Sequence, residues 1–208
     1  ANKQQEINIV SEKLDSIAAT ISKARNTSIP KLTKELENLL ADLGMENARL
    51  SIHIKPTKNY FSNGKDALEF LFSANKGGNY GELKKVASGG ELSRIMLSVK
   101  KVLSTSTQLP TIIFDEIDTG VSGEVSNKIA AIMQQMCHHM QVIAITHLPQ
   151  IAAKGSSHYK VFKEEINGVT TTNLKQLSSE ERIVEIAEML SGKDISDTAL
   201  IHAKELLN

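Results

Sequence analysis

The stretch Val86-Ala87-Ser88-Gly89-Gly90-Glu91-Leu92-Ser93-Arg94 decides how the rest of the chain is interpreted. It runs directly into apolar residues with the spacing of one helix face: Leu92, Ile95, Met96, Val99, Val102 and Leu103. The first turn of a helix has unpaired backbone N–H groups, and adjacent glycines let a ligand approach them closely. The stretch therefore predicts an anion site at a helix N-terminus, with an ordinary loop and helix cap as the local alternative.

Two β-branched, apolar runs lie downstream, and each ends in polar residues that suit catalysis. Residues 109–114 are followed by Asp115 and Glu116, and residues 141–146 are followed by His147. In α/β sheets, ligands bind at the carboxyl ends of the strands, where such side chains gather. A carboxylate at this position suits Mg²⁺, and a second one can orient or deprotonate an attacking water. We therefore expect Asp115 to hold the metal and Glu116 to act on the water.

The order and spacing of these motifs resemble the C-terminal part of an ABC-type ATPase head of the SMC kind. The resemblance rests on residues 88–94, on Phe114-Asp115-Glu116-Ile117-Asp118-Thr119-Gly120-Val121-Ser122-Gly123 and on Thr146-His147-Leu148-Pro149-Gln150. Within that group the chain is most similar to bacterial members that repair DNA double-strand breaks, from its helical beginning to its last residue. The resemblance implies an α/β fold, namely the C-terminal lobe of a P-loop ATPase head with an N-terminal coiled-coil-like helical extension.

The resemblance also implies the roles of individual residues. In such heads two copies enclose two ATP molecules, each with Mg²⁺. Asp115 is then the magnesium ligand, Glu116 the catalytic residue that activates water, and His147 a catalytic contact to the γ-phosphate. Ser88-Gly89-Gly90-Glu91 meets the ATP bound to the second head. Asp118 is expected to help bind ATP from a loop that crosses to the partner head, although capping of the following helix is an equally good local interpretation.

The phosphate-cradling motif Gly-x-x-x-x-Gly-Lys-Ser/Thr does not occur in this sequence. The nearest fragment, Gly64-Lys65, fails because Asn59 and Asp66 occupy the flanking motif positions. In the family this Walker A loop lies in an N-terminal lobe that precedes the coiled coil. We therefore expect a chain that needs that lobe as a partner and hydrolyses ATP only as part of the full-length protein.

The first 46 residues carry two apolar seams with alternating steps of three and four residues. The first seam runs from Ile7 to Ala24 and the second from Ile29 to Leu43, out of phase with each other. Pro30 lies between them, which predicts two helices or one broken helix. Gly44 is placed to end the last helix. We expect residues 1–46 to form a returning coiled-coil arm and residues 47–208 the C-terminal lobe of the head.

The remaining elements follow from simple patterns. Residues 49–55 alternate as a half-buried strand that Pro56 should stop, and residues 57–65 should then form a loop. Asn167-Gly168 predicts a hairpin turn. The other expected elements are a strand over 67–74 and helices over 124–138, 179–191 and 197–207.

The composition limits the partners and the cellular location that we expect. Lys plus Arg and Asp plus Glu both number 24, so the formal net charge is zero, and any contact of the full-length protein with DNA must come from a local patch. The single cysteine, Cys137, excludes an internal disulfide and fits a reducing cytosol. No apolar run predicts a membrane span. We expect a cytoplasmic, nucleoid-associated protein.

Two other functions stay open at this point. One is a coiled-coil dimerisation or scaffolding module that does not hydrolyse nucleotide, and the other is the nucleotide-binding domain of an ABC transporter. Paired carboxylates at a strand end argue against the scaffold, because burying or crowding them is costly without a cation. The heptad arm at residues 7–43 argues against the transporter domain.

Overall fold

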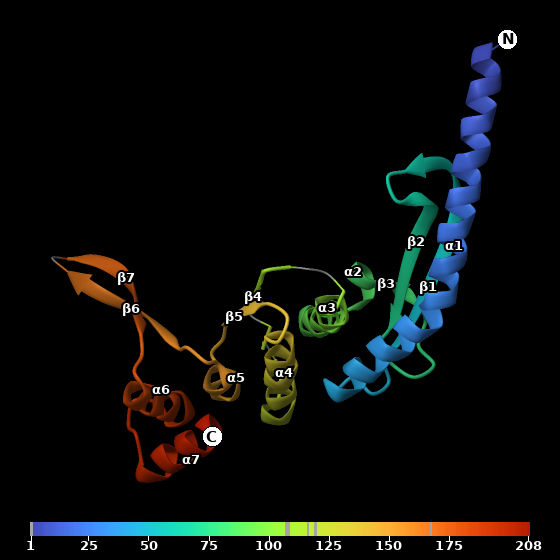
Figure 1. The fold of residues 1–208 in the computed structure, drawn as a ribbon. Coiled ribbons are helices and arrows are strands. Elements are labelled where there is room, and N and C mark those ends of the chain that lie inside the picture. Colours follow the sequence, from blue (N-terminus) through green and yellow to red (C-terminus); the bar gives the residue numbers. More distant parts are fainter. Residues whose placement is uncertain (1, 107–108, 116, 119, 167) are drawn as a thin grey trace. The chain divides into compact units, whose positions relative to one another are not determined.

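The computed structural model describes residues 2–106, 109–115, 117–118, 120–166 and 168–208 (Figure 1). The chain forms two compact units, residues 1–99 and residues 100–208. Each unit is described by itself below. None of the helices in the described ranges is long and apolar enough to span a membrane.

The first unit is a long helix beside an antiparallel sheet. Helix α1 (Asn2–Asp42) runs along the hairpin of β1 (Arg49–Phe61) and β2 (Gly64–Ser73), as Figure 1 shows. The short strand β3 (Gly81–Glu82) pairs with β2, so that the strand order is β1-β2-β3. Two helices follow this sheet in the sequence: α2 (Leu83–Val86) and α3 (Gly89–Ser104).

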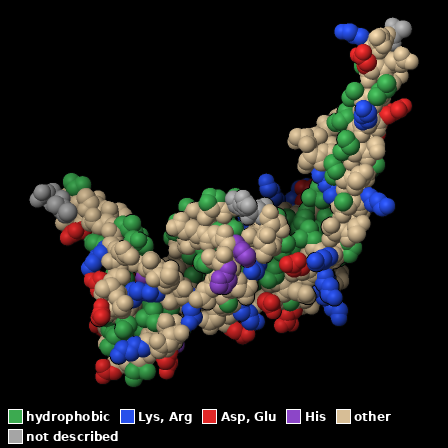
Figure 2. Space-filling view, in the orientation of Figure 1, with side chains coloured by type: hydrophobic (Ala, Val, Ile, Leu, Met, Phe, Trp, Pro, Cys, Tyr) green, Lys and Arg blue, Asp and Glu red, His purple; other side chains and the backbone are tan. Residues whose placement is uncertain are grey.

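The two ends of α1 have different surroundings. Near its C-terminal end Leu36, Leu40 and the following Leu43 are buried. Over the N-terminal half the first seam is exposed at Ile7, Val10, Leu14 and Ile17, and Figure 2 shows hydrophobic side chains on this part of the surface. An apolar seam in solvent is what an unpaired arm of a coiled coil presents.

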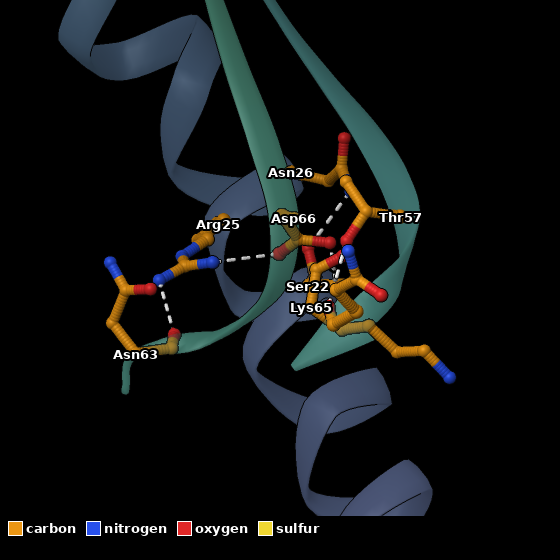
Figure 3. Close-up of polar contacts among 8 residues, drawn as sticks. Ser22, Arg25, Asn26, Thr57, Asn63, Lys65 and Asp66 are labelled. Carbon is orange, nitrogen blue, oxygen red and sulfur yellow. Dashed lines mark hydrogen bonds and ion pairs between the residues drawn. The ribbon is translucent and has the colours of Figure 1, made fainter. Parts of the chain in front are cut away.

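Polar contacts hold the middle of α1 to the hairpin (Figure 3). The carboxylate of Asp66, only 4% exposed, accepts hydrogen bonds from the Ser22 hydroxyl at 2.6 Å and from Arg25 Nη1 at 2.8 Å. Arg25 Nη2 also donates to the Asn63 carbonyl at 2.6 Å. Because these contacts cluster in the middle of the helix, they fix the direction in which its free half leaves the sheet.

The predicted break at Pro30 is wrong, because α1 is one continuous helix through this residue. Proline removes the helical N–H that would donate to the Asn26 carbonyl, and three side chains just before it bond to carbonyls four residues back, a contact that often bends a helix. These bonds join Asn26 to Ser22, Thr27 to Lys23 and Ser28 to Ala24, at 2.9 to 3.0 Å. Figure 1 shows α1 bending toward its C-terminal end, so the chain accommodates the proline by curvature.

The predicted end of the helix at Gly44 is confirmed. Gly44 has φ of 78°, and the N–H groups of Gly44 and Met45 donate to the carbonyls of Ala41 and Leu40. These two bonds form a Schellman motif, which satisfies the last helical carbonyls and favours glycine at this position.

The predicted stop at Pro56 and the loop over 57–65 are also wrong. Strand β1 continues through Pro56 to Phe61 and turns directly into β2 at Gly64. Strand β1 lies at the edge of the sheet, where a residue without an N–H is tolerated. The pairing becomes irregular between Pro56 and Phe61, which is where the proline interrupts the ladder.

The second unit begins with two parallel strands joined by a helix. Strand β4 (Thr111–Asp115) pairs with β5 (Gln141–Ile145), and the connection between them contains α4 (Gly123–Met136). Helix α4 buries Ile129, Met133 and Met136. This crossover brings the carboxyl ends of both strands to the same edge.

The rest of the second unit is a helix, a hairpin and two closing helices. These elements are α5 (Pro149–Lys154), β6 (Tyr159–Ile166), β7 (Val169–Gln176), α6 (Ser179–Ser191) and α7 (Asp197–Leu207). The predicted hairpin and both predicted helices are confirmed, and Ser178 caps α6. Asn167 of the predicted turn lies outside the described residues, while Gly168 has φ of 77°. A core of Ile186, Ala187 and Ala203 joins the closing helices.

Candidate functional site

The strand register brings two of the predicted site residues to one edge of the parallel pair. Asp115, the last residue of β4, lies opposite Ile145, the last residue of β5, and His147 follows two positions later. Asp115 and His147 are both exposed. Glu116, the predicted water-activating residue, lies outside the described residues. The edge therefore presents a carboxylate and an imidazole to solvent, as expected for a site rather than a core.

Asp118 occupies a different environment from the two residues at that edge. Its side chain is 1% exposed, and Oδ2 accepts hydrogen bonds from the Thr146 hydroxyl and from the His147 backbone N–H at 3.2 Å. The same oxygen lies 3.5 Å from Nδ1 of His147. The alternative that Asp118 caps the next helix is wrong, because Ser122 caps α4 by accepting from the Val125 N–H.

The turn that opens α3 is held by a reciprocal cap between Ser88 and Glu91. The backbone N–H and the hydroxyl of Ser88 both donate to Oε2 of Glu91 at 2.7 Å, while the Glu91 N–H donates to the Ser88 hydroxyl oxygen at 3.4 Å. The hydrogen bond from the Ser88 N–H is the main cause that lowers the pKa of Glu91. This is a capping box, so the local alternative of a helix cap is realised in this structure.

The glycines of the same turn leave space around the helix start. A Cβ built on Gly89 meets no atom within 4 Å, and Gly89 is exposed. Gly90 is the second residue of α3 and is half-buried. Within the described part of the chain, no contact around position 89 requires glycine.

Asp115 and the residues beside it suit magnesium only if other groups complete the site. In the described ranges, no three His, Cys, Asp or Glu side chains are grouped closely enough to hold a metal. Mg²⁺ typically takes one or two protein carboxylates together with substrate phosphates and waters. A single exposed carboxylate at a strand end fits that donor set.

Thr146 lies in the motif stretch 146–150, but the sequence patterns predicted no role for it. Its hydroxyl donates to Asp118 and accepts from the Leu148 N–H at 3.0 Å, so it connects the buried carboxylate to the loop after β5. In the sequence, the only hint of a role for Thr146 is a hydroxyl side chain between an apolar run and a histidine. This hint points to a role only when the structure shows Asp118 beside the hydroxyl.

The comparisons with known proteins agree with this geometry. The chain is 38% identical to the DNA repair protein RecN of Bacillus subtilis over an alignment of 228 positions, which covers 99% of this chain and 40% of that protein. It is 37% identical to the RecN of Deinococcus radiodurans, over 98% of this chain and 36% of that protein. The chain matches part of the RecN proteins over nearly its whole length. It spans about two fifths or less of the length of these RecN relatives. No protein-family model matches it.

Solved structures extend the comparison to the fold. The Smc head domain with a coiled coil and joint from Pyrococcus yayanosii matches with a TM-score of 0.60 and 18% identity, over 91% of this chain and 36% of that one. A structure from work on ATP-driven dimerisation of SMC ATPases matches with a TM-score of 0.51 and 18% identity, over 81% of this chain and 97% of that one. The predicted α/β head fold with a helical arm is thus confirmed for this RecN-like chain.

Proposed function

We propose that the chain is the C-terminal lobe of an ATP-hydrolysing, SMC-like protein of the RecN type that acts in DNA double-strand-break repair and recombination. The observation that carries this proposal is the β4–β5 register, because it places Asp115 and the residues leading to His147 at one sheet edge. An ATPase of this class needs a carboxylate for the metal and a polar contact for the γ-phosphate at such an edge.

The proposed roles follow the motifs. Asp115 would hold Mg²⁺, Glu116 would orient or deprotonate the attacking water, and His147 would contact the γ-phosphate of ATP. Bound Mg²⁺ would neutralise charge on the phosphates. The turn Ser88-Gly89-Gly90-Glu91 would meet the ATP held by a second head, since a helix start with open space at Gly89 admits a phosphate closely.

An exposed apolar face of the parallel strands is consistent with a further lobe that packs against it. Ile113, Ile143 and Ile145 lie on the face that also carries Asp115, and Ile113 is 62% exposed. Parallel strands are normally covered on both faces. We propose that an N-terminal lobe with the Walker A loop covers this face and brings the triphosphate to Asp115.

The remaining proposed partners concern the full-length protein. They are a second copy of the head in an ATP-dependent dimer, and DNA. A cytoplasmic, nucleoid-associated location belongs to the same proposal.

Titration of the chain with a separately produced N-terminal lobe would test the proposal. We expect negligible ATP hydrolysis by the chain alone, turnover when the lobe is added, and loss of that turnover in Glu116→Gln. Dimerisation of the assembled head should require ATP. A scaffolding module would instead dimerise equally with and without nucleotide. Robust ATP turnover by the chain alone, abolished by Glu116→Gln, would contradict the proposal that the Walker A loop comes from another lobe.

A further inference from the structure

One buried carboxylate organises the three residues that follow β5. Oδ2 of Asp118 accepts from the Thr146 hydroxyl and the His147 N–H, and the Thr146 hydroxyl oxygen accepts from the Leu148 N–H. All of these residues belong to the second unit. The backbone on both sides of His147 is therefore tied, directly or through Thr146, to Asp118.

Burying the Asp118 carboxylate lowers the stability of the folded chain. Asp118 is 1% exposed, and within the described part of the chain its Oδ1 is buried without a hydrogen-bond partner. A buried carboxylate oxygen without a donor loses hydration without compensation. An asparagine oxygen could accept the same two hydrogen bonds from Thr146 and the His147 backbone without burying a charge. The tie to the backbone alone does not explain the acid.

The contact that requires an acid is the one to the imidazole. Oδ2 lies 3.5 Å from Nδ1 of His147, while the histidine side chain is 71% exposed. A carboxylate attracts a proton on the nitrogen that faces it, and the hydrogen bond made by one ring nitrogen decides the role of the other. Nδ1 therefore faces Asp118, and Nε2 is the ring nitrogen that can contact a ligand.

We infer that Asp118 is a positioning residue that keeps Nδ1 of His147 protonated and turned inward, so that Nε2 meets the phosphate. In the doubly protonated ring, Nδ1–H is directed at Asp118 and Nε2–H donates to a phosphate oxygen. The carboxylate offsets the charge of the ring at that moment. This inference rests on the proposed function of His147 and adds to it the residue that sets its orientation.

The first test measures the ring directly and needs no nucleotide. In ¹⁵N-labelled chain, long-range ¹H–¹⁵N spectra at a pH where the ring is neutral should show His147 with the proton on Nδ1. Asp118→Asn should shift the ring to the Nε2–H form that free imidazole side chains favour. Asp194→Asn, an exposed acid between α6 and α7, is the matched control and should leave the ring signals unchanged.

The second test uses the chain assembled with its N-terminal lobe. Asp118→Asn should lower kcat for ATP about 10- to 100-fold, as loss of an orienting partner does, with KM changed by less than about twofold. Thr146→Val keeps the carboxylate and removes only the hydroxyl donor, so a smaller fall in kcat is expected. Thr111→Val, which loses a surface hydrogen bond at the other end of β4, is its control.

The outcomes separate this inference from the proposed function. If Asp118→Asn remains folded and keeps both the Nδ1–H signal and the wild-type kcat, the inference is overturned. If Asp118→Asn does not fold, a neutral His147 ring with its proton on Nε2 in the wild-type chain overturns the inference. If the wild-type assembly hydrolyses no ATP, the proposed function fails, while the ring spectra still decide the role of Asp118.

Discussion

Ser88 donates both its backbone N–H and its hydroxyl to one oxygen of Glu91, over 2.7 Å in each case. The same hydroxyl is the group that the proposed function assigns to a phosphate on a second head. The turn is therefore already satisfied in the absence of a ligand, and ATP would have to share or replace the contact with Glu91. This gives the turn two roles, helix capping and anion binding, which substitutions can separate.

Ser88→Ala should lower the free energy of unfolding of the chain by about 1 kcal/mol, because it removes a helix cap. In the assembled head it should also abolish ATP-dependent dimerisation. Urea unfolding measures the first effect, and sedimentation with and without ATP measures the second.

Ser178→Ala is the matched control for this substitution, because Ser178 forms the same capping box with Glu181 at the start of α6. It should cost a similar free energy and leave dimerisation intact. Equal loss of dimerisation in both variants would mean that Ser88 acts only as a cap.

Gly89→Ala should leave the chain as stable as the wild type or slightly more stable, since the added Cβ meets open space and alanine favours helix. It should nevertheless block ATP-dependent dimerisation, because the methyl group occupies the position that a phosphate would approach. Gly168→Ala is the contrasting variant. Its φ of 77° makes alanine strained, so it should destabilise the hairpin and spare dimerisation. Undiminished dimerisation of Gly89→Ala would refute close approach at this turn.

The sequence predicted the element order well wherever a local signal and the tertiary structure agree. Gly44 ends a helix and Gly168 lies at a hairpin turn because both positions require positive φ. The two prolines were misread for the opposite reason. Pro30 is tolerated because α1 curves instead of breaking, and Pro56 is tolerated because its strand lies at a sheet edge. Neither condition is visible in the local pattern.

The candidate site was predictable as a set of strand ends but not as a network. Asp115 and His147 could be placed because parallel strands align their carboxyl ends. The burial of Asp118 and its bonds to Thr146 and His147 could not, since they depend on how a loop folds back across the sheet edge. The exposure of the face that carries Ile113 could not be read from the apolar runs either.

Asp66→Asn should weaken the attachment of α1 to the hairpin in a pH-dependent way. The Ser22 hydroxyl, and then Arg25, lower the pKa of Asp66 below its ordinary value of 3.8. A group with a lowered pKa in the folded state stabilises the fold above its ordinary pKa, and this contribution is lost as pH falls through the folded-state pKa. The wild type should therefore be more stable than the variant at pH 7, and the difference should shrink below about pH 4. Urea unfolding at several pH values measures it.

Asp15→Asn provides a control on the same helix. Asp15 also bonds to the hairpin, through Lys65 Nζ and the Tyr60 hydroxyl at 2.7 Å, but its side chain is exposed. Solvent screens such pairs, so this variant should lose less stability than Asp66→Asn at pH 7. A larger loss for Asp15→Asn would place the main attachment of the arm at Lys65 instead.

If the N-terminal lobe binds the exposed face of β4 and β5, substitutions on this face should weaken its binding. Ile113→Glu and Ile143→Glu change exposed side chains, so each should alter the stability of the chain by no more than about 0.5 kcal/mol. If the lobe covers this face, each isoleucine becomes buried on binding, and a glutamate there should weaken the affinity at least about tenfold. Ile201→Glu, at a similarly exposed position on α7, should change neither quantity. Calorimetric titration of the three variants with the isolated lobe distinguishes them, and equal affinities would remove the main structural support for a lobe docked on β4 and β5.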